Sequence, residues 1–265
     1  MKRRIAIIGC GYLGNIVAAA VKNGLLPEYE LAGAMSRHKE DAEKLLSGTD
    51  GTAAETLGEL LSGHPDYVIE TASVAVVREC CIPVLKSGVS FIPLSVGAFA
   101  EEAFYEEVRK TAEEYHSRVY IPHGAVGGFD VLQTVSLMAE ASGGEIAAGI
   151  ETHKGPASLR NTPVYRSEME SSREAEAFAG TAADAIRLLP AKVNVAVASA
   201  LASAGPARTK ARIVSVSGFT GDDHRITAET EGVRAVLDVY SAESAIAGWS
   251  IVSLLRSLVS PVVFF

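Results

Sequence analysis

Three glycines near the start of the chain, Gly9, Gly11 and Gly14, have the spacing that a bound nucleotide phosphate requires. They follow the apolar run Ile5–Ile8 and precede a helix that we predict from Asn15 to Val21. The first glycine permits a tight turn, the second lets the backbone approach a pyrophosphate, and the third lets helix and strand pack closely. Unpaired N–H groups at the helix start then bind phosphate. We therefore predict a dinucleotide-binding turn made of Gly9, Gly11, Tyr12, Leu13 and Gly14. The alternative is a glycine-rich turn that binds no nucleotide.

The residues after the second predicted strand indicate which dinucleotide binds. This strand runs from Tyr29 to Met35 and is followed by Ser36 and Arg37. Folds that bind NAD place a carboxylate here for the ribose hydroxyls, and this chain has none before Glu40. A hydroxyl and a guanidinium suit a ribose 2′-phosphate instead. We expect Ser36 and Arg37 to favour NADP, with NAD as the alternative cofactor if Arg37 is only a solvated surface charge.

Polar residues follow two later predicted strands, over 67–70 and 90–94. The carboxyl ends of parallel strands form the ligand-binding edge of an open α/β sheet. We expect further cofactor contacts from Thr71, Ala72, Ser73, Ser95, Val96 and Gly97. The three hydroxyl side chains among them would lie on the nicotinamide side, or would serve only as helix caps.

Strands and helices alternate over the first part of the chain, which is typical of a Rossmann-type, doubly wound parallel sheet in the α/β class. Besides the elements above, we predict helices over 41–46, 56–61, 74–85 and 101–115, and a strand over 118–121. The closing segment 242–258 has helical spacing. We therefore predict a dinucleotide-binding domain over residues 1–122, completed by a C-terminal helix within 241–265.

The pattern changes at residue 123, where clustered strands with interspersed helices indicate a second, α+β domain over 123–240 for substrate binding and oligomerisation. We predict strands over 146–153, 211–217, 224–230 and 233–240, and helices over 129–141, 181–189 and 193–204. Glu231 and Gly232 suit a hairpin between the last two strands. Four acidic residues over 168–176 are interpreted as a solvated face.

Composition restricts the class of protein. A chain of 265 residues with 48% hydrophobic residues is expected to be globular. A net charge of −8 without a basic patch makes nucleic acid an unsuitable partner, and no apolar stretch is long enough to span a membrane. The three cysteines, Cys10, Cys80 and Cys81, lack the spacing of a disulfide framework or a metal site, which predicts a cytoplasmic protein without a bound metal.

Several segments occur together in a characteristic order. They are 9–14, Ser95–Ala98, Gly124–Asp130, Thr152–Pro156, Gly180–Ala185, Leu189–Ala196 and His224–Ile226. These segments are distributed over most of the chain, and in them the chain resembles the L-aspartate dehydrogenase family. The resemblance implies a Rossmann domain with an α+β domain, a homodimer, and NAD(P)-linked interconversion of L-aspartate with iminoaspartate or oxaloacetate plus ammonia. It also places the catalytic histidine on His224 and further cofactor contacts on Ala125 and Asn194.

The chain departs from the family pattern at three places. His123 replaces a usual serine, Asp222 replaces the asparagine of an Asn-x-His sequence, and Ser241–Ala245 replaces an Asn-Pro-Lys-Thr-Ser-like sequence. These departures leave two alternatives open. One is a reductase of another imine or oxo acid, and the other is a dinucleotide-binding sensor without turnover.

Hydride transfer from an amine carbon also requires a proton carrier and cations for the substrate carboxylates. We predict His224 as the proton carrier, because imidazole titrates near neutral pH. As substrate-binding residues for an amino acid or oxo acid we predict His123, Gly124 and Lys154. Arg160 and Arg166 are further candidates, with surface charge as the alternative.

Overall fold

The structure is a computed structural model that describes residues 2–190 and 193–264. Its residues form two compact units, the first made of Met1–Gly124 with Ala245–Phe265 and the second of Ala125–Ser244. The first contains a parallel sheet with helices on both faces, and the second contains a mixed sheet with helices. The predicted fold class, a Rossmann-type α/β unit with an α+β unit, is confirmed.

The sheet of the first unit has the strand order β3-β2-β1-β4-β5, and all neighbouring strands are parallel. Its strands are β1 (Arg3–Ile8), β2 (Tyr29–Met35), β3 (Thr52–Ala54), β4 (Tyr67–Glu70) and β5 (Ser90–Pro93). Its helices are α1 (Tyr12–Lys22), α2 (Lys39–Leu46), α3 (Leu57–Ser62), α4 (Val74–Lys86), α5 (Glu102–Glu114) and α9 (Ala245–Val259), with the short 3-10 helix η1 (Val96–Ala100).

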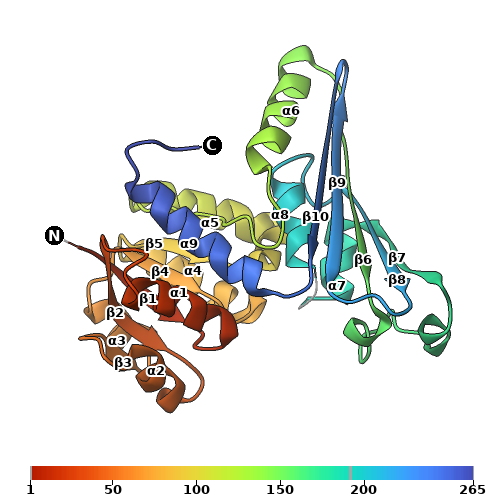
Figure 1. Ribbon diagram of the computed structural model, residues 1–265. Coiled ribbons are helices and arrows are strands. Elements are labelled where there is room, and N and C mark those ends of the chain that lie inside the picture. Colours follow the sequence, from red (N-terminus) through yellow and green to blue (C-terminus); the bar gives the residue numbers. More distant parts are fainter. Residues whose placement is uncertain (1, 191–192, 265) are drawn as a thin grey trace. The chain divides into compact units, whose positions relative to one another are not determined.

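Helix α9, from the end of the chain, packs beside α1, and Figure 1 shows the two helices side by side in front of the sheet. The buried side chains of Ile5 and Ile7 on β1 pack with Val17 and Ile251 on these helices in one apolar cluster. The hydroxyl of Tyr29 donates a hydrogen bond of 2.7 Å to the carbonyl of Leu255. Burial of this apolar face fixes the strand ends that carry the glycine turn.

The sheet of the second unit has the strand order β10-β9-β6-β8-β7, in which β6 is parallel to β8 and antiparallel to β9. Its strands are β6 (Ala147–Lys154), β7 (Glu174–Thr181), β8 (Lys210–Val216), β9 (Asp222–Thr230) and β10 (Val233–Ser241). Its helices are α6 (Phe129–Ser142), α7 (Ala182–Leu188) and α8 (Asn194–Leu201), with short 3-10 helices η2 (Pro156–Ser158) and η3 (Ser167–Glu170). The alternate residues Ile150, Thr152 and Lys154 of β6 are buried, so one face of the sheet is covered.

Three local elements differ from the sequence prediction. Residues 118–121 are not a strand: only Val119 forms a bridge, to Phe91, and Pro122 has no N–H with which to extend the pairing. Strand β7 was missed, because its acidic residues were interpreted as a solvated face and a bulge after Glu176 interrupts the strand alternation. Strand β3 was missed because it has only three residues. The hairpin between β9 and β10 is confirmed, and Gly232 in its turn has φ +76°.

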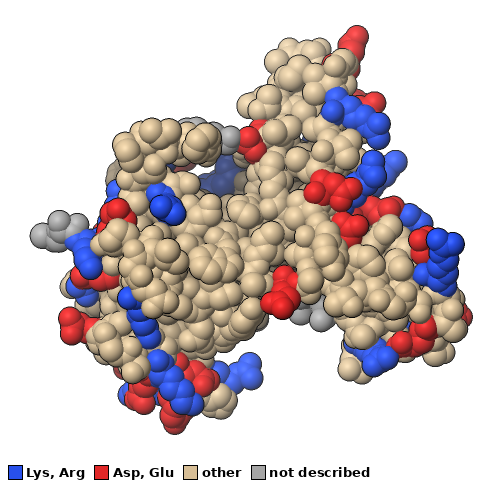
Figure 2. All heavy atoms as spheres, in the orientation of Figure 1, with Lys and Arg blue, Asp and Glu red and all other residues tan. Residues whose placement is uncertain are grey.

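Charged side chains of both signs lie together over the α2 part of the first unit, at the lower left of Figure 2. Lys39 on α2 pairs there with Glu55 at 2.7 Å. In the described part of the chain, no helix has the length and apolar character needed to cross a membrane.

Candidate active site

The glycine turn between β1 and α1 has the backbone that the sequence predicts. Gly9 has φ +99°, and a Cβ there would lie 2.8 Å from the carbonyl carbon of Thr71. A Cβ on Gly14 would overlap the carbonyl oxygen of Gly9. The helix therefore approaches the strand so closely that only glycine fits at this position. At Gly11, by contrast, a Cβ would have no heavy atom of the described residues within 4 Å. The turn is therefore packed at its first and third glycines and open at its second, where a phosphate would approach.

An open groove of about 960 Å³ lies beside this turn in the first unit. Its lining includes the predicted cofactor residues Gly9, Gly11, Ser36, Arg37, Thr71, Ala72 and Ser73. The residues that follow β1, β2 and β4 therefore lie together around this groove. Tyr12 is exposed beside the groove at the start of α1.

A carboxylate also lines the groove, at a position that we predicted to lie in the next helix. Asp41 on α2 lines it together with Ser36 and Arg37. Arg37 is exposed and, within residues 2–190 and 193–264, has no ion-pair partner, whereas the neighbouring Lys39 is held by Glu55. A guanidinium and a carboxylate are therefore both available to a ribose.

Ser95, Val96 and Gly97 do not line this groove. All three are buried at the end of β5 and the start of η1. Their predicted cofactor contacts stay a prediction.

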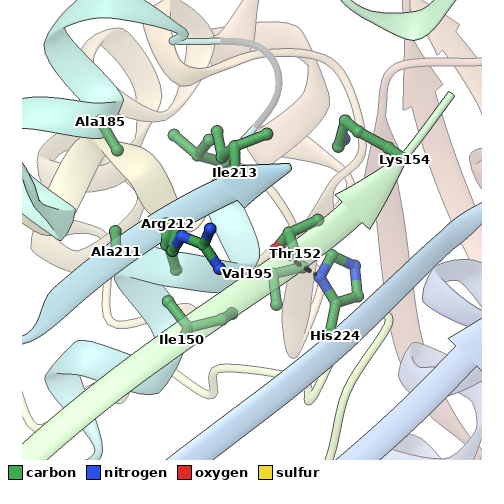
Figure 3. Close-up of a pocket in the computed structure, with 11 residues that line it drawn as sticks. Ile150, Thr152, Lys154, Ala185, Val195, Ala211, Arg212, Ile213 and His224 are labelled. Atoms are coloured by element: carbon green, nitrogen blue, oxygen red, sulfur yellow. Dashed lines mark hydrogen bonds between the residues drawn. The ribbon is translucent and has the colours of Figure 1, made fainter. Parts of the chain in front are cut away.

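In the second unit, two cross-strand pairs of β6 and β9 form the centre of a candidate catalytic site. Thr152 lies opposite His224, and Oγ1 of Thr152 is 2.9 Å from Nδ1 of His224. Lys154 lies opposite Asp222, and Nζ of Lys154 is 3.1 Å from Oδ1 of Asp222. Figure 3 shows Thr152, Lys154 and His224 around the same cavity.

Burial controls the charge state of this site. His224 is 4% exposed, and burial lowers the pKa of its imidazole to about 4. The Asp222 carboxylate opposes this shift and the Lys154 ammonium adds to it. At neutral pH the imidazole is therefore uncharged and has one nitrogen free to accept a proton.

The cavity between this pair and helix α8 is small, about 10 Å³, which is room for one water molecule. An amino-acid substrate is larger and must bind outside it. Ser215 on β8 lies in register with Lys154, and within the described chain its buried hydroxyl has no hydrogen-bond partner. Thr152 was not predicted as a site residue, because only strand register brings it to His224.

The remaining predicted site residues are His123, Gly124, Ala125 and Asn194. His123 belongs to the first unit, and its buried Nδ1 has no hydrogen-bond partner in the described residues. The N–H of Gly124 donates to the hydroxyl of Ser250 on α9 at 3.1 Å. Ala125 is the first residue of the second unit, and Asn194 begins α8 next to the cavity-lining residue Val195. Ala191 and Lys192 of the family-like segment lie outside the described residues.

The two candidate arginines are not part of the His224 site. Arg160 pairs with Glu170 at 2.8 Å and Arg166 with Glu168 at 2.9 Å, and all four side chains are at least 36% exposed. The interpretation of these arginines as surface charges is the one that the structure favours.

Two family models together match most of the chain. Residues 9–122 match the family model described as the NAD-binding domain of homoserine dehydrogenase, and residues 136–258 match that of the C-terminal part of aspartate dehydrogenase. L-aspartate dehydrogenase of Methanosarcina barkeri is 32% identical, with 98% of each chain covered. L-aspartate dehydrogenase of Methanococcus maripaludis is 29% identical with the same coverage.

A solved structure agrees with these relatives. The crystal structure of aspartate dehydrogenase from Thermotoga maritima matches with a TM-score of 0.79 and 25% identity, and the match covers 100% of both chains. The resemblance seen in the sequence is thus confirmed over the whole length of the chain. The chain belongs to the L-aspartate dehydrogenase family of NAD(P)-dependent amino-acid dehydrogenases.

Proposed function

We propose that this protein oxidises the α-amine of L-aspartate to an imine, which water converts to oxaloacetate and ammonia, and that it catalyses the reverse reaction. The observation that carries the proposal is the buried, uncharged His224 held by Thr152, next to the Lys154–Asp222 ion pair. An imidazole and an ammonium are the groups that proton transfer and carboxylate binding require.

The glycine turn fits a dinucleotide. Gly11 leaves open space at the N-terminus of α1, where N–H groups and the helix dipole favour phosphate. We propose that Ser36 and Arg37 hold a ribose 2′-phosphate, which favours NADP, while Asp41 would serve the ribose hydroxyls of NAD. When bound, the nicotinamide ring accepts or donates the hydride.

His224 performs the proton step of the proposed reaction. With its proton on Nδ1, donated to Oγ1 of Thr152, the neutral ring keeps Nε2 as the basic nitrogen for the substrate or for water. In the oxidative direction the α-carbon gives up its hydrogen as hydride, the α-amine loses a proton, and the C=N bond forms. A neutral imidazole takes that proton, and the imidazolium returns it in the reverse direction.

Lys154 binds a substrate carboxylate in this proposal. Its ammonium is buried and already paired with Asp222, so a carboxylate of L-aspartate must share or replace that partner. His123 and Gly124 are proposed as further substrate contacts, since the buried Nδ1 of His123 has no partner among the described residues.

The Asp222–Lys154 pair also favours a second candidate substrate class. Because Asp222 already neutralises the ammonium, an amino acid or oxo acid without a second carboxylate would leave the pair intact. The protein would then act as a reductase of a different imine.

A substrate panel under both directions tests the proposal. We expect turnover of L-aspartate with NADP⁺, and of oxaloacetate with ammonia and NADPH, to exceed that of monocarboxylic amino acids and oxo acids. His224→Ala should lower kcat at least 100-fold and leave the dinucleotide Kd within twofold of the wild type. A variant that keeps a near-normal rate would show that another group carries the proton.

The cofactor preference has its own test. We expect Arg37→Ala to raise the KM for NADPH about tenfold and to leave the KM for NADH unchanged, because only NADPH has the 2′-phosphate. Lys39→Ala, which removes a neighbouring charge already paired with Glu55, is the matched control. A strong NADH preference of the wild type would contradict the assignment to NADP.

A further inference from the structure

Glu70, the last residue of β4, is a buried carboxylate whose partners are four uncharged donors. Its Oε1 accepts hydrogen bonds from the N–H groups of Ala72 at 2.6 Å and Ser73 at 2.7 Å. The same oxygen accepts the hydroxyl of Ser95 at 2.9 Å, and Oε2 accepts the Ser95 N–H at 3.0 Å. One side chain thus connects the loop after β4 with the loop after β5.

These donors require an acceptor at both oxygens. Backbone N–H groups can only donate, so both oxygens of Glu70 must accept, which a carboxylate does without a proton on either oxygen. Burial raises the pKa of the Glu70 carboxyl, and its four hydrogen bonds oppose that rise. Four donors around the two oxygens favour the ionised form.

The connection extends to the glycine turn. The hydroxyl of Thr71 donates to the carbonyl oxygen of Gly9 at 2.7 Å, and the N–H of Thr71 donates to the carbonyl of Ile8 at 2.8 Å. The ends of β1, β4 and β5 are therefore tied together through two adjacent residues, Glu70 and Thr71. Thr71, Ala72 and Ser73 line the dinucleotide groove, whereas Glu70 itself is 0% exposed and does not.

We propose that Glu70 is a positioning residue for the dinucleotide: it holds the loops after β4 and β5 in the conformation that receives the nicotinamide end. Loops that already have the bound conformation lose less conformational entropy when the dinucleotide binds. This inference rests on the dinucleotide assignment of the groove, and it goes beyond it by naming a residue that acts without touching the cofactor.

The test compares a whole dinucleotide with a fragment that lacks its nicotinamide end. The probes are NADPH or NADH, whichever the wild type binds more tightly, and ADP, with each Kd measured by calorimetry. In Glu70→Gln an amide NH₂ replaces one acceptor oxygen and faces an N–H donor. We expect this variant to raise the dinucleotide Kd at least tenfold and to leave the ADP Kd within twofold. The KM for the dinucleotide should rise while kcat at saturation is retained.

Two other variants complete the experiment. Glu30→Gln removes a half-exposed carboxylate on β2 of the same unit and should leave both Kd values within twofold. Glu70→Asp keeps a carboxylate on a side chain one methylene shorter, which cannot hold both loops, and should raise the dinucleotide Kd about threefold without affecting ADP. If Glu70→Gln does not fold, Glu70→Asp decides the question by the same comparison.

Two results would overturn the positioning role alone. One is a dinucleotide Kd in folded Glu70→Gln, or in Glu70→Asp if that must decide, that equals the wild-type value. The other is an equal loss of affinity for both probes, which would indicate general loosening of the unit. A wild-type protein that binds neither NADPH nor NADH would overturn the proposed function together with this inference.

Discussion

Thr152 and His224 face each other across the paired strands β6 and β9, with 2.9 Å between the threonine hydroxyl and Nδ1 of the imidazole. Both side chains are more than nine-tenths buried. A hydroxyl at Nδ1 fixes the ring orientation and directs Nε2 toward any reacting group, much as a histidine's second nitrogen is commonly held by a partner in other catalytic sites.

Thr152→Val should therefore slow the reaction without weakening cofactor binding. The change keeps the shape of the side chain and removes one buried hydrogen bond, which contributes about 0.5–1.5 kcal/mol, so kcat should fall up to about tenfold. Thr152→Ser retains the hydroxyl and should keep most of the rate. Steady-state kinetics with L-aspartate checks both variants, and equal rates in Thr152→Val and wild type would argue against the orienting role.

The lowered pKa of His224 predicts how stability depends on pH. The imidazole has a pKa of about 4 in the folded protein and about 6.5 when unfolded, so the unfolded chain binds more protons between these values. Stability from this group is fully present above pH 6.5 and is lost as the pH falls toward 4. The loss should amount to at most roughly 3 kcal/mol.

Urea unfolding of wild type and His224→Gln between pH 4 and 7 measures this contribution. We expect the wild type to lose more stability than the variant as the pH falls, because glutamine does not titrate. His38→Gln is the matched control, since that histidine is exposed in the first unit. Parallel curves for wild type and His224→Gln would mean that the folded imidazole titrates as it does in the unfolded chain.

The buried ion pair predicts a non-additive pair of substitutions. Lys154→Met leaves the Asp222 carboxylate without its cation and should destabilise the protein by about 2–4 kcal/mol, toward the lower end because Asp222 is 38% exposed. Lys154→Met/Asp222→Leu removes both charges and should recover more than half of that loss. Chemical denaturation of the two single variants and the double variant gives the coupling energy, and simple additivity would show that the ions act independently.

Much of the nucleotide-binding unit could be predicted from sequence because its determinants are local. The apolar run before Gly9 and the spacing to Gly14 specify strand, turn and helix within a few residues, and the structure shows the φ value and close packing that these glycines permit. His224 and Lys154 were also found, from residue type and family pattern, although their roles stay proposals.

What the sequence did not predict depends on distant pairings. Thr152 reaches His224 across 72 positions through the register of β6 and β9, and nothing in the residues near Thr152 indicates that register. Glu70 bonds Ser95 across 25 positions. The one signal available was a glutamate closing the otherwise apolar strand 67–70, since a buried carboxylate requires donors.

The contrast between Gly11 and Gly14 provides a prediction that separates folding from binding. Gly11 has φ −79°, which alanine adopts readily, and a Cβ there meets no heavy atom within 4 Å. Gly11→Ala should cost about 1 kcal/mol of stability or less, at the level of a helix N-cap change. It should nevertheless raise the dinucleotide Kd at least tenfold, because the new methyl group occupies the space through which the pyrophosphate approaches.

Gly14→Ala should show the opposite order of effects. Its Cβ would overlap the Gly9 carbonyl, so strand and helix must move apart, at a cost of about 3 kcal/mol. Thermal unfolding and calorimetric titration of both variants check this contrast. If Gly11→Ala binds the dinucleotide as tightly as the wild type does, then the phosphates do not lie over the second glycine, and the open space beside Gly11 has no part in cofactor binding.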